Sequence, residues 1–178
     1  MNNLLKVILI ACLLSSCTTD ISSYRESQPK FDIKQYFSGN IIAWGMVQDY
    51  TALQTRRFSV KLIGEQTDSN TLVLREWFDY DDGEKSERVW TIKRTSGGTH
   101  TGEADDIIGV ASGREQGNAF NWRYDFKLKL DDGDVVVHFD DWLFRQDSHH
   151  LFNITKIKKF GVEVGRITLF FDKTAAEQ

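Results

Sequence analysis

Residues 119–130 read AFNWRYDFKLKL, and their pattern indicates the class of fold. Large apolar side chains occupy every second position over residues 120–128, with Asn, Arg, Asp and Lys between them. A period of two places the apolar side chains on one face of a β-strand and the polar side chains on the other. Residues 57–62 (RFSVKL) alternate in the same way. Both runs predict strands of an antiparallel sheet with one buried face.

The chain from Asn40 onward has the same organisation throughout. Apolar, aromatic and β-branched runs alternate with clusters of Gly, Asp and Asn, and no run shows the 3.6-residue period of an amphipathic helix. The predicted strands are residues 41–50, 57–64, 71–80, 86–94, 99–104, 107–111, 119–130, 134–144, 151–159 and 163–172. We expect a bend at Ser112. Pairs that accept the positive φ of tight hairpins separate several strands, namely Asp82-Gly83, Gly97-Gly98, Gly117-Asn118 and Asp132-Gly133.

A long series of antiparallel strands either leaves two exposed edges or closes on itself, and closure removes the edges. We therefore predict an all-β domain over residues 31–178, a single antiparallel up-and-down β-barrel of the lipocalin-like kind. A two-sheet β-sandwich is the alternative. A transmembrane barrel fits less well, because outward positions carry Arg, Lys and Asp rather than apolar side chains.

Two residues favour the lipocalin-like form of the barrel. Trp44 in the first strand would close one barrel end from inside, and Arg166 in the last strand would stack on it through a cation–π contact. Plain core packing is the other interpretation of Trp44.

The N-terminus has the features of an export signal. One Lys precedes the apolar run VILIACLL at residues 7–14, which is too short for a membrane span of ~20 residues. Leu14-Ser15-Ser16-Cys17 resembles the bacterial lipobox. This predicts a signal peptide over residues 1–16 and acyl chains on Cys17, which would become the mature N-terminus and anchor the protein in a membrane. Cys12 lies in the removed part, so we expect no internal disulfide.

The residues after the lipobox indicate the destination. Thr18 stands where an Asp commonly signals retention in the inner membrane, so we expect the periplasmic face of the bacterial outer membrane. Residues 17–30 are polar apart from the anchor and hold the only Pro, which predicts a flexible tether.

Composition and charge limit the classes of function. The 178 residues have 12% aromatic content, which argues against disorder. The formal net charge is −4, which gives no basic footprint, so we expect no nucleic-acid partner.

Catalytic signatures are missing. The sequence has no Gly-x-Ser-x-Gly elbow, no His-Glu-x-x-His and no phosphate loop, so we assign no catalytic residue, metal or cofactor. We interpret His149-His150 as solvated turn residues. If the protein were an enzyme acting on lipids, Asp105 or Asp140 would be its general acid or base, with a strongly raised pKa.

Two acidic doublets are the most informative polar residues. In Asp105-Asp106 and Asp140-Asp141, one carboxylate of each pair faces inward whichever register holds, because neighbours on a strand point to opposite faces. An inward carboxylate needs a partner or has a raised pKa. Arginines within predicted strands would supply ion pairs: Arg75, Arg88, Arg123 and Arg145. Structural ion pairs and a site for a ligand's polar head both remain open.

The candidate ligand-binding set combines these charged residues with aromatic side chains. Its members are Trp44, Trp77, Asp105, Asp106, Trp122, Arg123, Asp140, Asp141, Trp142 and Phe144. The aromatic members would line a cavity, but a filled barrel needs the same residues for packing.

Several segments together resemble a known family. They are the lipobox at Cys17, FDIKQYFSGNIIAWGMVQDY from Phe31, FDYDDGEKSERVW from Phe78, GEADDIIGVASGREQGNAFNWRY from Gly102, HFDDWLFRQD from His138 and FGVEVGRITLFF from Phe160. These stretches are similar to a family of proteobacterial lipoproteins known as domain of unknown function 3833. The resemblance implies a lipocalin-like fold, an outer-membrane anchor and no established activity.

Members of that family are often encoded beside enzymes that modify membrane fatty acyl chains, which makes lipid a plausible cargo. We therefore expect an outer-membrane lipoprotein that binds a hydrophobic or amphipathic small molecule, with a fatty acyl lipid as the leading candidate. The alternative is a non-enzymatic structural or assembly factor of the cell envelope with a filled barrel.

Overall fold

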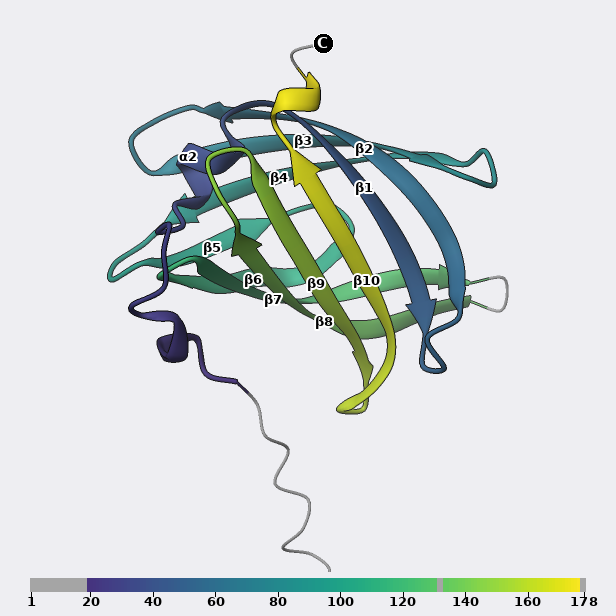
Figure 1. Ribbon diagram of the computed structural model, residues 1–178. Coiled ribbons are helices and arrows are strands. Elements are labelled where there is room, and N and C mark those ends of the chain that lie inside the picture. The colour runs from purple at the N-terminus through teal and green to yellow at the C-terminus, as the bar shows by residue number, and fades with distance from the viewer. Residues whose placement is uncertain (1–18, 131–132, 177–178) are drawn as a thin grey trace, which may run out of the picture.

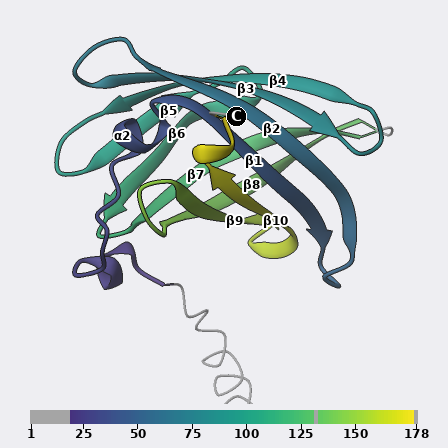
Figure 2. The same cartoon turned by 45° about the horizontal axis from the view of Figure 1, so that its top comes forward.

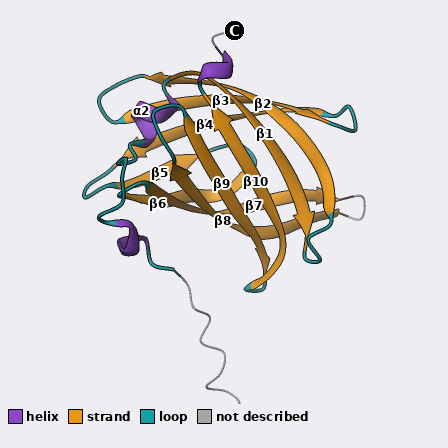
Figure 3. Cartoon of the chain, viewed as in Figure 1, coloured by secondary structure: helices purple, strands orange, loops and turns teal. Residues whose placement is uncertain are grey.

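The computed structural model describes residues 19–130 and 133–176. The predicted signal peptide, Cys17 and Asp132 lie outside the described residues. Ten strands run in sequence order around one barrel, each paired antiparallel with its chain neighbours (Figures 1 and 3). Their bounds are β1 Gly39–Asp49, β2 Gln54–Gln66, β3 Thr71–Tyr80, β4 Lys85–Arg94, β5 Thr99–Glu103, β6 Ile107–Gln116, β7 Ala119–Leu130, β8 Gly133–Arg145, β9 His150–Lys159 and β10 Val162–Asp172.

Pairing between the first and last strands closes the barrel. β1 and β10 are antiparallel over eight residue pairs, from Ile42 opposite Asp172 to Asp49 opposite Gly165. This ladder confirms the predicted up-and-down barrel and excludes the two-sheet sandwich. No helix within the described ranges is long and apolar enough to cross a bilayer.

Most strand bounds agree with the prediction, and β6 is the main difference. The predicted bend at Ser112 is wrong, because Ser112 lies in the β6–β7 ladder opposite Arg123. The irregularity falls just before it, between Ile108 and Ser112, where Gly109 has a φ of +73°. The Phe160-Gly161 turn was not predicted: both residues have positive φ, 52° and 80°, as a tight hairpin between β9 and β10 requires.

A short helix plugs one end of the barrel. The helix α2 (Ile33–Phe37) begins at Asp32, whose carboxylate accepts a hydrogen bond from the Gln35 N–H at 2.9 Å. Phe37 lies so close to β2 that a Cβ on Gly64 would sit 1.7 Å from the Phe37 carbonyl oxygen. Only glycine permits this approach, so Gly64 allows the plug to seat against the wall.

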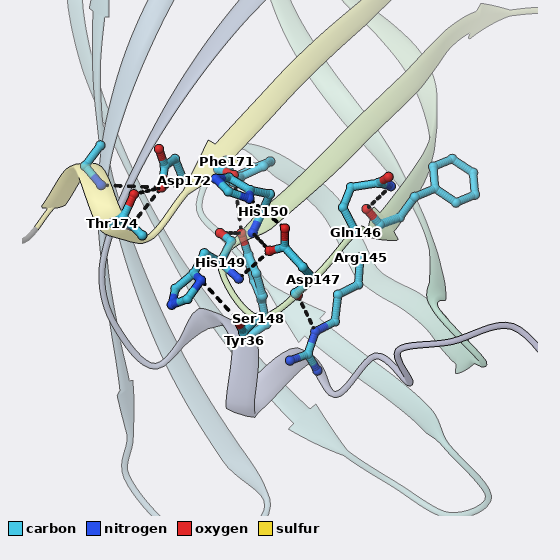
Figure 4. Close-up of polar contacts among 12 residues, drawn as sticks. Tyr36, Arg145, Gln146, Asp147, Ser148, His149, His150, Phe171, Asp172 and Thr174 are labelled. Atoms are coloured by element: carbon cyan, nitrogen blue, oxygen red, sulfur yellow. Dashed lines mark hydrogen bonds and ion pairs between the residues drawn. The ribbon is translucent and has the colours of Figure 1, made fainter.

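Polar contacts hold the plug to the β8–β9 hairpin (Figure 4). The Tyr36 hydroxyl donates to the His149 carbonyl oxygen at 2.8 Å, although Tyr36 is otherwise buried. Within the hairpin, the Asp147 carboxylate accepts from the N–H groups of His149 and His150 at 2.7 and 2.8 Å. The His150 ring also contacts Asp147 at 2.8 Å. His149 lies in the turn, as predicted, whereas His150 is the first residue of β9 and lies opposite Asp172 in the β9–β10 ladder.

The predicted stack of Arg166 on an inward Trp44 is wrong. Trp44 lies on the outer wall opposite Phe170 and is 47% exposed. Arg166 instead pairs with Glu163 at 2.7 Å. One end of the barrel is instead closed by α2, whose Tyr36 and Phe37 pack into the core.

The segment before α2 is also different from the prediction. Within the predicted flexible tether of residues 17–30, residues 19–30 run along the outside of the barrel and include η1 (Ile21–Tyr24) (Figures 1 and 2). The Tyr24 ring lies 5.7 Å from Trp142 and 5.5 Å from Phe144. The guanidinium of Arg145 donates to the Lys30 carbonyl oxygen at 2.9 Å. The described part of the expected tether is therefore docked on β8.

We expect Tyr36→Phe to lower the free energy of unfolding by about 1 kcal/mol, because it removes a buried hydrogen bond and leaves the His149 carbonyl without that donor. Chemical denaturation measures this change. Tyr50→Phe makes the same chemical change at a side chain that is 81% exposed and should shift stability by less than about 0.5 kcal/mol. Equal effects from both variants would contradict the role of the Tyr36 contact.

Candidate functional site

The barrel encloses a cavity of about 620 Å³. It reaches from Ile33 and Phe37 of α2 to Glu84 and Lys127, which lie toward the opposite hairpins. Its size is within the range of about 300–1,000 Å³ that is common for small-molecule sites. The interior is therefore not filled by side chains.

Aromatic side chains form much of the cavity wall. Trp90 packs edge-on against Trp122 and Tyr124, with ring centroids 5.8 and 5.2 Å apart. Phe126 stacks on Phe139 at 5.0 Å. The inward members of β7 are the alternating apolar residues that predicted the strand, so its pattern also builds the wall of the site.

Charged and hydroxyl groups form a cluster within this aromatic wall. We call it the interior polar cluster, and it consists of Glu76, Arg88, Asp106, Tyr124 and Asp141. Arg88 holds Asp106 through Nε and Nη2, each 2.7 Å from Oδ2 of that carboxylate. The five residues come from β3, β4, the β5–β6 turn, β7 and β8, so only the closed barrel brings them together.

Asp141 is the most deeply buried carboxylate of the cluster. Its residue is 8% exposed, and its Oδ1 has no hydrogen-bond partner among the described residues. Burial raises the pKa of Asp141 to about 6, although hydrogen bonds from Thr155 and Tyr124 and the charge of Arg88 oppose the rise. The carboxylate is therefore close to its titration point at neutral pH.

Glu76 has a similar environment. Burial raises the pKa of Glu76 to about 7; Arg88 opposes this rise, whereas Asp106 and Asp141 add to it. Burial likewise raises the pKa of the Tyr124 hydroxyl, so Tyr124 stays neutral and is available as a donor. The cluster thus combines one cation with three carboxylates whose charges are held close together in a partly apolar cavity.

Asp140 has the opposite environment to its neighbour. It lies on the outer wall, where its carboxylate is 2.6 Å from Lys158 Nζ and 3.2 Å from Arg123 Nε. Burial by itself would raise the pKa of Asp140, but hydrogen bonds from Lys158, Asn121 and Arg123 outweigh it and lower the pKa to about 2. The expectation of a raised pKa at Asp140 is wrong, and Asp141 is the member of the pair that has one.

The structure divides the predicted ligand-binding residues between two faces. Those that line the cavity are Asp106, Trp122 and Asp141. Those that do not line it are Trp44, Trp77, Asp105, Arg123, Asp140, Trp142 and Phe144. The interior placement predicted for Trp44, Trp77, Trp142 and Phe144 is wrong, because each occupies the alternate position to an inward residue of its strand. Asp105 is exposed in the β5–β6 turn.

Glu76 was missed by the sequence analysis. It follows Leu72 and Leu74 at intervals of two on β3, and this spacing is the signal that would have placed it inside. Arg88 was considered only as a source of ion pairs, and it does pair with an inward carboxylate. Of the other arginines considered, Arg123 pairs on the outer wall and Arg75 is exposed.

The described part of the chain contains no visible metal-binding site. No three His, Cys, Asp or Glu side chains there are grouped in a way that would hold an ion. The interior polar cluster offers hydrogen bonding and charge pairing to a molecule in the cavity, and the aromatic wall offers apolar contact.

The fold agrees with comparisons to known proteins. The chain belongs to the family described as "Protein of unknown function (DUF3833)", whose model matches residues 11–173. No curated protein matches the chain. The barrel is similar to the solved structure of the S-type phycobiliprotein lyase CPES from Guillardia theta, with a TM-score of 0.56, 10% identity, and coverage of 78% of this chain and 87% of that chain. At this identity the likeness shows the lipocalin-like fold alone.

We expect substitutions at the two adjacent aspartates to change stability in opposite directions. Asp140→Asn should lower the free energy of unfolding by about 1–3 kcal/mol near neutral pH, because it weakens a hydrogen-bonded group of charges. Asp141→Asn should raise it by about 1 kcal/mol, because it removes a buried carboxylate that lacks a full set of donors. Denaturant unfolding of both variants measures this, and a loss of stability in Asp141→Asn would show that its carboxylate is a structural member of the core.

Proposed function

We propose that this protein is an outer-membrane lipoprotein that binds an amphipathic small molecule inside its barrel, and that a fatty acyl lipid is the leading candidate. The observation that carries the proposal is the cavity of about 620 Å³ with an aromatic wall and a buried polar cluster. An apolar wall with a few convergent polar groups is the usual composition of a small-molecule site.

The same cavity argues against the alternative of a filled barrel that acts only through its surface. A filled barrel has side chains in contact across its axis, and the volume here is far larger than the small voids of a packed core. The similar fold of a phycobiliprotein lyase supports a barrel that receives a ligand, without indicating which ligand.

The docked N-terminal segment bears on how the barrel would sit at a membrane. Cys17 is two residues before Thr19, so an extended chain between them spans only about 7 Å. Because residues 19–30 lie along the barrel, acyl chains on Cys17 would hold the barrel close to the bilayer surface rather than at the end of a long tether.

We expect the chain from Thr18 onward, expressed in the periplasm, to carry a bound molecule. Native mass spectrometry should show an added mass that disappears after organic extraction. Rebinding should change tryptophan fluorescence through the two indoles of the cavity. Trp122→Phe should reduce this change, whereas Trp77→Phe, on the other face of the barrel, should retain it. A protein that stays at its bare mass, also with added fatty acyl lipids, would contradict the proposal.

Anchoring has its own test. Cys17→Ser should remove acylation and release the protein from the outer-membrane fraction, whereas Cys12→Ser, within the predicted signal peptide, should leave both unchanged. Fractionation and mass spectrometry of the N-terminal peptide measure the outcome. A Cys17→Ser protein that stays in the outer membrane would contradict the lipid anchor.

A further inference from the structure

The interior polar cluster has more negative than positive charge. Glu76, Asp106 and Asp141 contribute three carboxylates, and Arg88 is the cation among them. The two other cations that line the cavity, Arg56 and Lys127, each pair with carboxylates: Arg56 with Asp82 and Glu84, and Lys127 with Asp134. The positive groups around the cavity are thus already matched by acidic partners.

Two acceptor atoms of the cluster are left without a donor. Oδ1 of Asp106 and Oδ1 of Asp141 are both buried and have no hydrogen-bond partner among the described residues. Buried acceptors are nearly always satisfied in native proteins, and an unsatisfied charged one is costly. Both residues line the cavity, so a molecule bound there would lie beside these two carboxylates.

The excess of carboxylates in the interior polar cluster would repel an anionic head group. Arg88 directs Nε and Nη2 to Asp106 and lies near the charge of Glu76, so it is not free to receive a second carboxylate. A free fatty acid would bring a fourth negative charge to the cluster. Like charges in a partly buried site repel strongly, because water does not screen them fully.

The aromatic wall is suited to the opposite charge. The guanidinium carbon of Arg88 lies 5.2 Å from the ring centroid of Phe126 and 5.9 Å from that of Trp90. Aromatic faces attract cations, so the same wall that accommodates Arg88 also favours a second positive group beside it.

We propose that the ligand's polar end is a cationic hydrogen-bond donor, such as an ammonium group, which donates to Asp141 and Asp106 while Glu76 balances its charge. This inference rests on the proposed function and narrows it. An acyl lipid with an amine in its head group fits the site, whereas a free fatty acid does not.

Displacement of a neutral fluorescent probe tests this assignment. The chain from Thr18 onward, which contains every described element, is first loaded with N-phenyl-1-naphthylamine. Dodecylammonium, dodecanoate and dodecanol then compete at about pH 7.5. The three compounds have the same number of carbon atoms and differ in the polar group, which is cationic, anionic or neutral. We expect dodecylammonium to bind at least about ten-fold more tightly than dodecanoate, with dodecanol between them.

Asp141→Asn should abolish most of this preference and leave the affinity for dodecanol nearly unchanged. The matched control is Asp125→Asn on the outer wall, where Asp125 contacts only His138 among the ion pairs, and it should keep the full preference. Equal or tighter binding of dodecanoate, or an unchanged preference in Asp141→Asn, would overturn the assignment of a cationic head group. If the probe itself does not bind, the proposed ligand site in the barrel is contradicted. If the probe binds but the preference for dodecylammonium is absent, only the cationic head group is contradicted.

Discussion

Backbone pairing between β1 and β10 closes the barrel and creates its interior. Without it, ten antiparallel strands would leave two edges and no enclosed volume. With it, every strand has one inward and one outward face. The ladder therefore determines both the hydrogen bonding of the backbone and which side chains meet in the interior.

The N-terminal part of the chain contacts the barrel at two places. At one end α2 inserts Tyr36 and Phe37, and the contact of the Tyr36 hydroxyl with the β8–β9 hairpin ties the plug to the wall. The segment before the plug is docked outside, where Tyr24 covers Trp142 and Phe144. These aromatic residues thus serve the attachment of the N-terminal segment, and the cavity is built from a separate set.

The interior polar cluster lowers the stability of the fold and offers polar groups to a bound ligand. Three carboxylates and one guanidinium are held within an aromatic wall, and two of their oxygen atoms have no donor among the described residues. A core selected only for stability would replace them with apolar groups. Unsatisfied buried charge beside an open cavity is a common feature of sites in which the missing partner is supplied by a bound molecule.

Asp140 and Asp141 show what the local sequence pattern predicts and what it does not. Because adjacent strand residues face opposite sides, the sequence predicted that one carboxylate would be inside, and this is confirmed. It did not predict which one. A shift of the register by one residue exchanges the two faces, and the choice here places Asp140 against Lys158 and Asp141 in the cavity. The same register places Trp142 on the outer wall, whereas the prediction placed this large aromatic residue inside.

The strands and most of the hairpin turns were predictable from local sequence, because alternation and turn chemistry act over a few residues, and the long series of strands predicted closure. The register of the polar residues, the α2 plug, the docked N-terminal segment and the composition of the interior polar cluster emerge only in the folded barrel. These depend on contacts between residues distant in the chain, such as Tyr36 with His149 and Arg88 with Asp106. Such contacts form only when the strands have paired and packed, so no local pattern encodes them.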